Sequence, residues 1–127
     1  MISRKPTFND WSKLAEMFSQ EMVAEWMVRS NEDPKWISYV TIDHKQIIAA
    51  ILGVYNDQTK DLEIGIFMQP EGKPDIGNYL INKTLNNGIP KDIQSITMLG
   101  DANKQEAYKA LNFNPLVITY RREVNGK

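Results

Sequence analysis

Cysteine is absent from the 127 residues of this chain, and histidine occurs once, as His44. The chain can therefore form no disulfide framework, no thiolate nucleophile and no cysteine-based zinc site, and a single histidine cannot make a metal-binding cluster. We predict no metal site. The motif "DHKQ" around His44 is typical of a hairpin turn.

The sequence also lacks an excess of one charge and a long apolar run. Its 15 Lys and Arg residues nearly balance 16 Asp and Glu residues, which gives a net charge of -1. Such a balance does not indicate a nucleic-acid partner or an anionic membrane surface. The N-terminal "MISRKPTFNDW" has no apolar core like that of a signal peptide, and no stretch is apolar for long enough to span a bilayer. We therefore expect a cytoplasmic protein.

Proline and glycine are scattered along the chain, and no biased tract marks a linker or a tail. A length of 127 residues, with 42% hydrophobic and 24% charged residues, is enough for one sizeable core. The composition predicts a single domain over residues 1–127.

Helical spacing dominates the N-terminal part of the chain. Thr7 is followed three residues later by Asp10, which is a capping-box pattern at a helix start. The apolar positions that follow are three or four residues apart: Trp11, Leu14, Ala15, Phe18, Met22, Val23, Trp26 and Met27. This pattern predicts one long helix or two abutting helices, ending near "NEDP". The preceding "MISRK" could form a short edge strand.

Three segments with strand character follow, at residues 36–42, 47–55 and 61–68. The short polar turns "DHKQ" and "NDQTK" separate them, so we predict three antiparallel strands. Strict alternation in the third strand would put its side chains on two faces: Leu62, Ile64, Ile66 and Met68 on one, and Glu63, Gly65 and Phe67 on the other.

The remainder of the chain alternates between helical and strand patterns. Ile76, Leu80 and Thr84 mark a helix after "PEGKPDIG", and "NNGIP" ends it. A strand "IQSITML", a short helix "NKQEAYKALNF" and a last strand "PLVITYRREV" follow. This order predicts an α/β (α+β) fold, with a mixed, mainly antiparallel sheet flanked by helices.

Two segments resemble the GNAT superfamily of N-acetyltransferases. The segment "LEIGIFMQPEGKPDIGNYLINKTL" is similar to the family's acetyl-coenzyme A segment, and "DANKQEAYKALNF" is similar to its late helix, which commonly ends in a Tyr, Lys, Gly and Phe pattern. The predicted strand order agrees with the family. The resemblance implies a GNAT-like domain that uses acetyl-CoA as co-substrate, without a metal, and transfers acetyl to a primary amine by direct attack in a ternary complex.

The family's phosphate loop follows R/Q-x-x-G-x-G/A, in which small residues let backbone N–H groups approach a pyrophosphate. Aligned from the helix side, Gly77 matches the pattern, but Gly72 stands for Arg or Gln and Asp75 for the first glycine. Aligned from the strand side, Gln69 and Gly72 fit the opening, but Pro74 takes the second Gly/Ala position. We prefer the helix-side alignment. The coenzyme contacts that the resemblance implies are Phe67, Met68, Gly72, Lys73, Asp75, Ile76, Gly77 and Asn78.

The loop also has a purely structural interpretation, as a strand-to-helix turn with Pro74 at the first helical position and Asp75 in the first turn. Lys73 could supply a cation to the pyrophosphate, or it could be a solvated loop lysine.

Catalytic roles follow from the same resemblance. Tyr108 stands at the family's frequent general-acid tyrosine, and a phenol with a pKa of about 10 can protonate a thiolate leaving group. A tyrosine packed on an amphipathic helix is the equal alternative. Glu63 is the candidate base, with a solvated glutamate as the alternative, and a backbone N–H around Phe67 and Met68 would stabilise an oxyanion. Asn112 replaces a family glycine and can take the same left-handed conformation.

A second hypothesis is a catalytically inactive GNAT-fold module that binds or inhibits a protein partner. Asp75 and the missing Arg or Gln favour it, whereas the enzyme is favoured by Ile76, Gly77, Leu80 and Tyr108. The acceptor stays open among small-molecule, peptide and protein amines. A homodimer is a further expectation, for which the edge strand "VITYRREV" is the hint.

Overall fold

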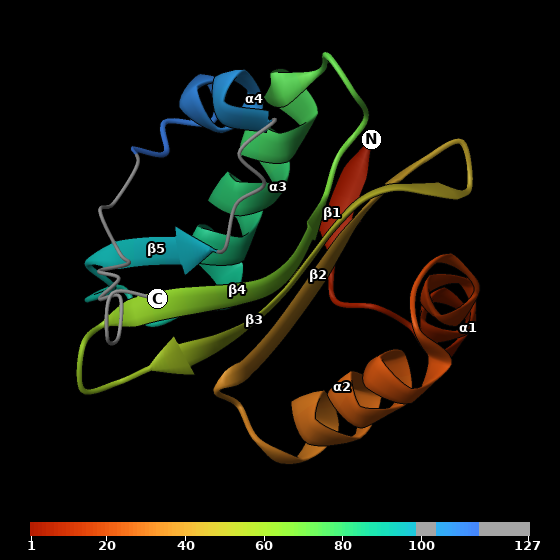
Figure 1. Cartoon of the computed structure of the whole chain (residues 1–127). Coiled ribbons are helices and arrows are strands. Elements are labelled where there is room, and N and C mark those ends of the chain that lie inside the picture. Colours follow the sequence, from red (N-terminus) through yellow and green to blue (C-terminus); the bar gives the residue numbers. More distant parts are fainter. Residues whose placement is uncertain (99–103, 115–127) are drawn as a thin grey trace, which may run out of the picture.

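One sheet organises the part of the chain that the computed structural model describes, residues 1–98 and 104–114. Its strands are β1 (Ile2–Arg4), β2 (Trp36–Asp43), β3 (Gln46–Asn56), β4 (Asp61–Met68) and β5 (Ser95–Met98), in the spatial order β1-β2-β3-β4-β5 (Figure 1). β5 is parallel to β4, and the other neighbours are antiparallel. The predicted mixed, mainly antiparallel sheet is confirmed.

Helices cover both faces of the sheet (Figure 1). The helices α1 (Phe8–Met17) and α2 (Gln20–Glu32) lie on one face, and α3 (Pro74–Asn87) and α4 (Gln105–Ala110) lie on the other. Each face has its own apolar core. On the α1–α2 side, the buried residues are Trp11, Leu14, Val23, Val40, Ala50 and Leu52. On the α3–α4 side, they include Ile37, Tyr39, Ile51, Leu62, Leu80, Ile81 and Leu111.

Of the two alternatives for the N-terminal helical pattern, the chain forms two helices. Thr7 and Asp10 make the predicted capping box at the start of α1. Phe18 then takes an extended conformation, and the Ser19 hydroxyl accepts a hydrogen bond from the Met22 N–H to begin α2. The break lets both short helices turn an apolar side to the same face of the sheet.

The turn between β2 and β3 is tight. His44 and Lys45 have φ angles of 49° and 64°, and the register pairs Asp43 with Gln46 across them. Two consecutive positive φ values are the geometry that matches the twist of a two-residue hairpin. The expected role of His44 as a turn residue is confirmed.

A bulge in β4 shows that the predicted face assignment was wrong. Leu52 of β3 pairs with Ile66, yet the next residue of β3 pairs with Ile64, so Gly65 is an extra residue in the ladder. An extra residue reverses the alternation of side chains beyond it. The β4 side chains therefore divide differently: Leu62, Ile64 and Phe67 join the α3–α4 core, and Ile66 and Met68 join the α1–α2 core.

The strand and the short helix predicted after α3 are both present, as β5 and α4. β5 and α4 are both shorter than the strand and helix predicted from the pattern. The predicted last strand, residues 115–124, lies outside the described residues. Among the helices of the described ranges, none combines the length and apolar character needed to cross a membrane.

Candidate functional site

The two segments that carry the family resemblance meet in space at the first turns of α3 and the end of α4. The Asn78 side-chain amide donates a hydrogen bond to the Ala110 carbonyl oxygen at 3.4 Å. A Cβ placed on Gly77 would lie 2.9 Å from Leu111 Cδ2. We call this contact region, formed by Gln69, Gly77, Asn78, Ala110 and Leu111, the α3–α4 junction. Figure 1 shows the two helices beside each other.

The loop before α3 contains a tight turn. The Lys73 N–H donates to the Pro70 carbonyl oxygen at 3.3 Å, and Gly72 has a φ of 73°. A positive φ at the third residue of a turn favours glycine, so the turn alone explains Gly72. The space beside Gly72 is open, with no atom within 4 Å of a Cβ built there. A ligand could therefore approach the backbone at this point.

The start of α3 carries no side-chain cap. Lys73 occupies the N-cap position without a side-chain hydrogen bond, and Pro74 is in the first helical turn, as the structural interpretation of the loop predicted. The side chains of Lys73 and Asp75 are exposed. The partial positive charge of a helix start favours an anion. Lys73 strengthens that preference, and the carboxylate of Asp75 opposes it.

Gly77 is buried against side chains of its own chain. A Cβ at Gly77 would collide with Oε1 of Gln69 and would lie 3.0 Å from Gln69 Cδ. Internal packing by Gln69 and Leu111 is therefore a sufficient reason for glycine at this position. We call the space that a Gly77 side chain would occupy the Gly77 notch.

Gln69 was considered from the sequence only as one end of an alternative alignment. Its Oε1 is buried and has no hydrogen-bond partner within the described residues. The sequence signal for it is limited to a polar residue that directly follows an apolar strand, and this signal does not reveal the long-range contact with α3.

The end of α4 has the expected helix stop. The Phe113 N–H donates to the Tyr108 carbonyl oxygen at 3.0 Å, and the Asn112 N–H donates to the Lys109 carbonyl oxygen at 2.9 Å. Asn112 has a φ of 65°. These two bonds around a left-handed residue form a Schellman motif. The predicted left-handed Asn112 is confirmed.

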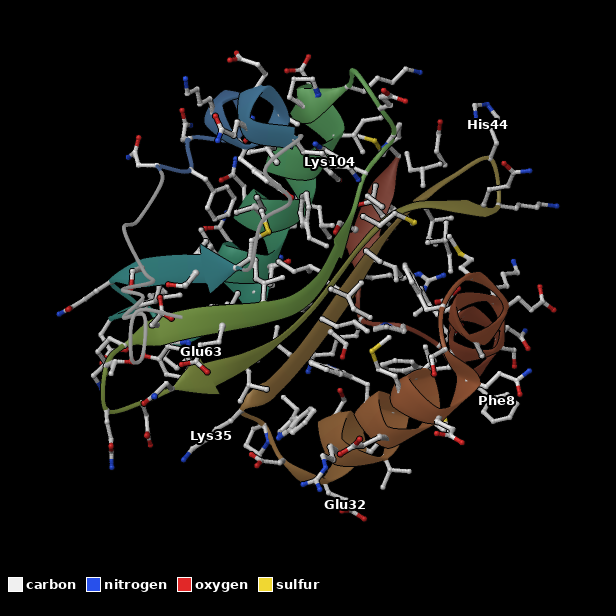
Figure 2. All side chains as sticks on the ribbon, in the orientation of Figure 1. Phe8, Glu32, Lys35, His44, Glu63 and Lys104 are labelled. Atoms are coloured by element: carbon white, nitrogen blue, oxygen red, sulfur yellow. The ribbon has the colours of Figure 1, made fainter. Side chains whose placement is uncertain are left out.

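The side chains of the two candidate catalytic residues lie on opposite faces of the sheet. Tyr108 is half-buried in α4, on the α3 side. Glu63 is exposed on β4 between two residues that face the α3–α4 core, and Figure 2 shows its side chain on the side of β4 turned away from α3. The structure does not bring Glu63 and Tyr108 to one face.

β4 extends beyond the stretch over which it pairs with the described part of β5. In the described residues, β5 pairs with β4 from Asp61 to Ile64. Phe67 and Met68 lie beyond that paired stretch, at the end of β4 that leads into the loop. Backbone groups at this end of β4 are therefore not used by the described part of β5.

Trp26 of α2 lies over the β4 bulge, and the sequence interpretation named it only as an apolar helix position. A Cβ on Gly65 would be 2.8 Å from Trp26 Cη2. The rings of Trp26 and Trp36 meet edge to face with centroids 4.7 Å apart, and Arg29 Cζ is 5.1 Å from the Trp36 ring centre. The isolated glycine in "EIGIF" was the available signal for this bulge.

Within residues 1–98 and 104–114, the structure contains no group of three or more His, Asp or Glu side chains that could hold a metal ion.

Comparison with known proteins identifies the fold. No family model matches the chain, and no curated protein matches its sequence. Solved structures match it over almost its whole length. A "possible acetyltransferase" from Clostridium difficile 630 is 15% identical, with 97% of each chain covered and a TM-score of 0.67. An aminoglycoside N-acetyltransferase in complex with CoA is 16% identical, with 97% of this chain and 100% of that chain covered and a TM-score of 0.66.

The chain has the GNAT fold. A third structure of this fold, a transcriptional regulator from Bacillus halodurans C-125, is 13% identical, with 97% of this chain and 99% of that chain covered and a TM-score of 0.66. At such identities the likeness concerns the fold, and the GNAT fold carries more than one named function among these neighbours. The chemistry of this chain must therefore be argued from its own residues.

Proposed function

We propose that this protein is an N-acetyltransferase, which transfers the acetyl group of acetyl-CoA to a primary amine by direct attack in a ternary complex. The observation that carries the proposal is the α3–α4 junction. There the segment that resembles the family's acetyl-CoA segment contacts the segment that resembles its late helix, through Asn78 with Ala110 and Gly77 with Leu111. A chance resemblance of two separate segments would not require them to meet.

The coenzyme would be held at the start of α3. When bound, acetyl-CoA supplies an acetyl thioester and a pyrophosphate. The open backbone at Gly72, the exposed Lys73 and the uncapped first turn of α3 suit the phosphates. The family resemblance adds Asp75, Ile76, Gly77 and Asn78 along that turn, and Phe67 and Met68 at the end of β4.

The chemical roles would be divided between the two faces of the sheet. Tyr108 would protonate the departing thiolate from the α4 side. Glu63 would remove a proton from the amine, directly or through water. Because these residues lie on opposite faces, the reacting atoms would sit between β4 and β5, beyond their paired stretch. A backbone N–H near Phe67 or Met68 would stabilise the oxyanion there.

A second candidate function is a catalytically inactive GNAT-fold module that binds or inhibits a protein partner. The exposed carboxylate of Asp75 in the first turn of α3 favours it, because a negative charge there opposes a pyrophosphate. In either case we propose a cytoplasmic protein. Experiments must determine separately which class of amine is the acceptor and whether the protein forms a homodimer.

Calorimetric titration with acetyl-CoA tests the proposal and separates the two candidates. We expect a micromolar Kd for the unmodified protein and a rise in its melting temperature. Asp75→Asn removes only a charge and should tighten binding about threefold, since one repulsive surface charge contributes a few tenths of a kcal/mol or more. Glu16→Gln, an exposed charge removal in α1, should leave the Kd unchanged.

Absence of heat and of a melting shift at millimolar acetyl-CoA would contradict the transferase and leave the binding module. If the coenzyme binds, a screen of amines for release of free thiol should find an acceptor. Tyr108→Phe should then lower kcat roughly 100-fold, the contribution typical of general acid catalysis, while the Kd for acetyl-CoA stays the same.

A further inference from the structure

The side chain of Gln69 is the unexplained feature of the α3–α4 junction. Gln69 comes directly after Met68, the last residue of β4. Its Oε1 is buried without a hydrogen-bond partner in the described ranges. Folded proteins give nearly every buried polar atom a partner, so an unpaired carboxamide oxygen calls for a physical reason.

The position of this carboxamide is defined by Gly77. Oε1 and Cδ of Gln69 lie where a Gly77 side chain would be, and Leu111 closes the same space from α4. The end of Gln69 thus fills the Gly77 notch and lies between β4, the first turns of α3 and the end of α4.

This contact is weakly held. The carboxamide oxygen gains no hydrogen bond in the notch, whereas it would accept bonds from water outside it. Gln69 has three rotatable side-chain torsions, so it can leave the notch without movement of the backbone. The filled and the open notch should therefore be close in free energy.

We propose that Gln69 gates access of the coenzyme to α3: its carboxamide fills the Gly77 notch in the ligand-free protein and rotates out when a phosphate-bearing coenzyme binds. This inference rests on the proposed use of acetyl-CoA. The gate lowers the apparent affinity, because only the fraction of molecules with an open notch is ready to bind.

Two substitutions should change the notch in opposite ways. Gln69→Ala removes the carboxamide and leaves the notch open. Gly77→Ala places a methyl group where the carboxamide lies and displaces that flexible end, so the notch stays filled, while the Leu111 methyl, 2.9 Å away, must shift slightly. Because this methyl group is present with or without Gln69, the double variant should behave like Gly77→Ala and not like Gln69→Ala.

The experiment is a calorimetric titration of acetyl-CoA into the unmodified protein, the two single variants and the double variant. Gln69→Ala should bind roughly fivefold more tightly than the unmodified protein, whereas Gly77→Ala and the double variant should both bind more weakly than Gln69→Ala. Gln58→Ala serves as the matched control, since Gln58 is an exposed glutamine in the β3–β4 turn. Its Kd should be unchanged.

A structural readout accompanies the titration. In NMR spectra of the unmodified protein, the Gln69 side-chain amide protons should show cross-peaks to the Gly77 α-protons, and saturation with acetyl-CoA should remove them. Tighter binding by Gln69→Ala together with this loss would support the gate.

Three results would overturn the gate, and they separate its failure from that of the proposed function. Equal affinities for all proteins would remove the gate and keep the coenzyme. Weaker binding by Gln69→Ala would make Gln69 a ligand contact instead. No binding by the unmodified protein or by any variant would reject both the gate and the proposed use of acetyl-CoA.

Discussion

The helices on the two faces of the sheet begin in different ways. On the α1–α2 side, α1 starts with the Thr7–Asp10 capping box and α2 with the Ser19 hydroxyl. On the α3–α4 side, Lys73 and Lys104 occupy the N-cap positions without side-chain hydrogen bonds. Side chains therefore cap the helix starts on one side and not on the other, where the Ile76 N–H of α3 donates to the Lys73 carbonyl oxygen instead.

Buried polar groups do not separate the two sides in the same way. On the α1–α2 side, the buried Asp10 accepts hydrogen bonds from Arg4 and from the Thr7 N–H. In the described residues, each side also has one buried polar atom without a hydrogen-bond partner, Trp26 Nε1 on the α1–α2 side and Gln69 Oε1 on the α3–α4 side. Regions that bind ligands are commonly less stabilised than the rest of a fold. The contrast in helix starts suggests that the α1–α2 side supports the fold and the α3–α4 side carries function.

The largest stability effect should come from the α1–α2 side. Asp10→Ala removes the capping-box carboxylate and leaves Arg4 without its buried partner, so it should lower the free energy of unfolding by about 2 kcal/mol. Asp75→Ala replaces the acidic residue in the first turn of α3 and should change the free energy of unfolding by less than about 0.5 kcal/mol. Urea denaturation measures both. Equal effects would contradict the comparison.

Acid should destabilise the fold by protonating the carboxylate of Asp10. Burial would raise the pKa of Asp10, but hydrogen bonds from Arg4 and Thr7 outweigh burial and hold the pKa below its ordinary value of 3.8. A lowered pKa stabilises the fold at pH values above 3.8, and this contribution is lost as the pH falls through the folded-state pKa. Urea midpoints from pH 7 to pH 2.5 should therefore fall more steeply for the unmodified protein than for Asp10→Asn. Parallel curves would assign the acid sensitivity to other groups.

Gln69→Met should stabilise the fold, by less than Asp10→Ala destabilises it. Methionine has a similar length, fills the Gly77 notch and carries no carbonyl group to leave unpaired. The free energy of unfolding should rise by about 1 kcal/mol, at the lower end of the cost of a buried unsatisfied group. Thermal unfolding measures the change, and Gln58→Met is the control. A lower melting temperature would mean that the Gln69 carboxamide stabilises the junction.

The smallest effect should come from adding a cap to α3. Lys73→Ser supplies a hydroxyl at the N-cap and should raise the free energy of unfolding by about 0.5 kcal/mol. The same change removes a cation and occupies backbone N–H groups of the first turn, so coenzyme binding should weaken. Stability and affinity, measured on one preparation by urea denaturation and calorimetry, should move in opposite directions. A parallel change would separate the helix start from the ligand site.

Local patterns in the sequence predicted those features that depend on neighbouring residues. The Thr7–Asp10 box, the two hairpins and the left-handed Asn112 each follow from a few adjacent side chains. The strand order could be predicted because the patterns alternate clearly and resemble a known family. Two features required contacts across the chain. Strict alternation missed the bulge, for which Gly65 was the sole signal, and the occupation of the Gly77 notch by Gln69 depends on residues eight positions apart, in different elements.

The most direct test of the difference between the two faces is a titration with acetyl-CoA followed by amide NMR shifts. The proposed function predicts that shifted amides cluster in residues 66–78 and around Tyr108, and that amides of α1 and α2 do not move. Shifts confined to α1 and α2, or no shifts at millimolar acetyl-CoA, would contradict the assignment of the α3–α4 side as the coenzyme site.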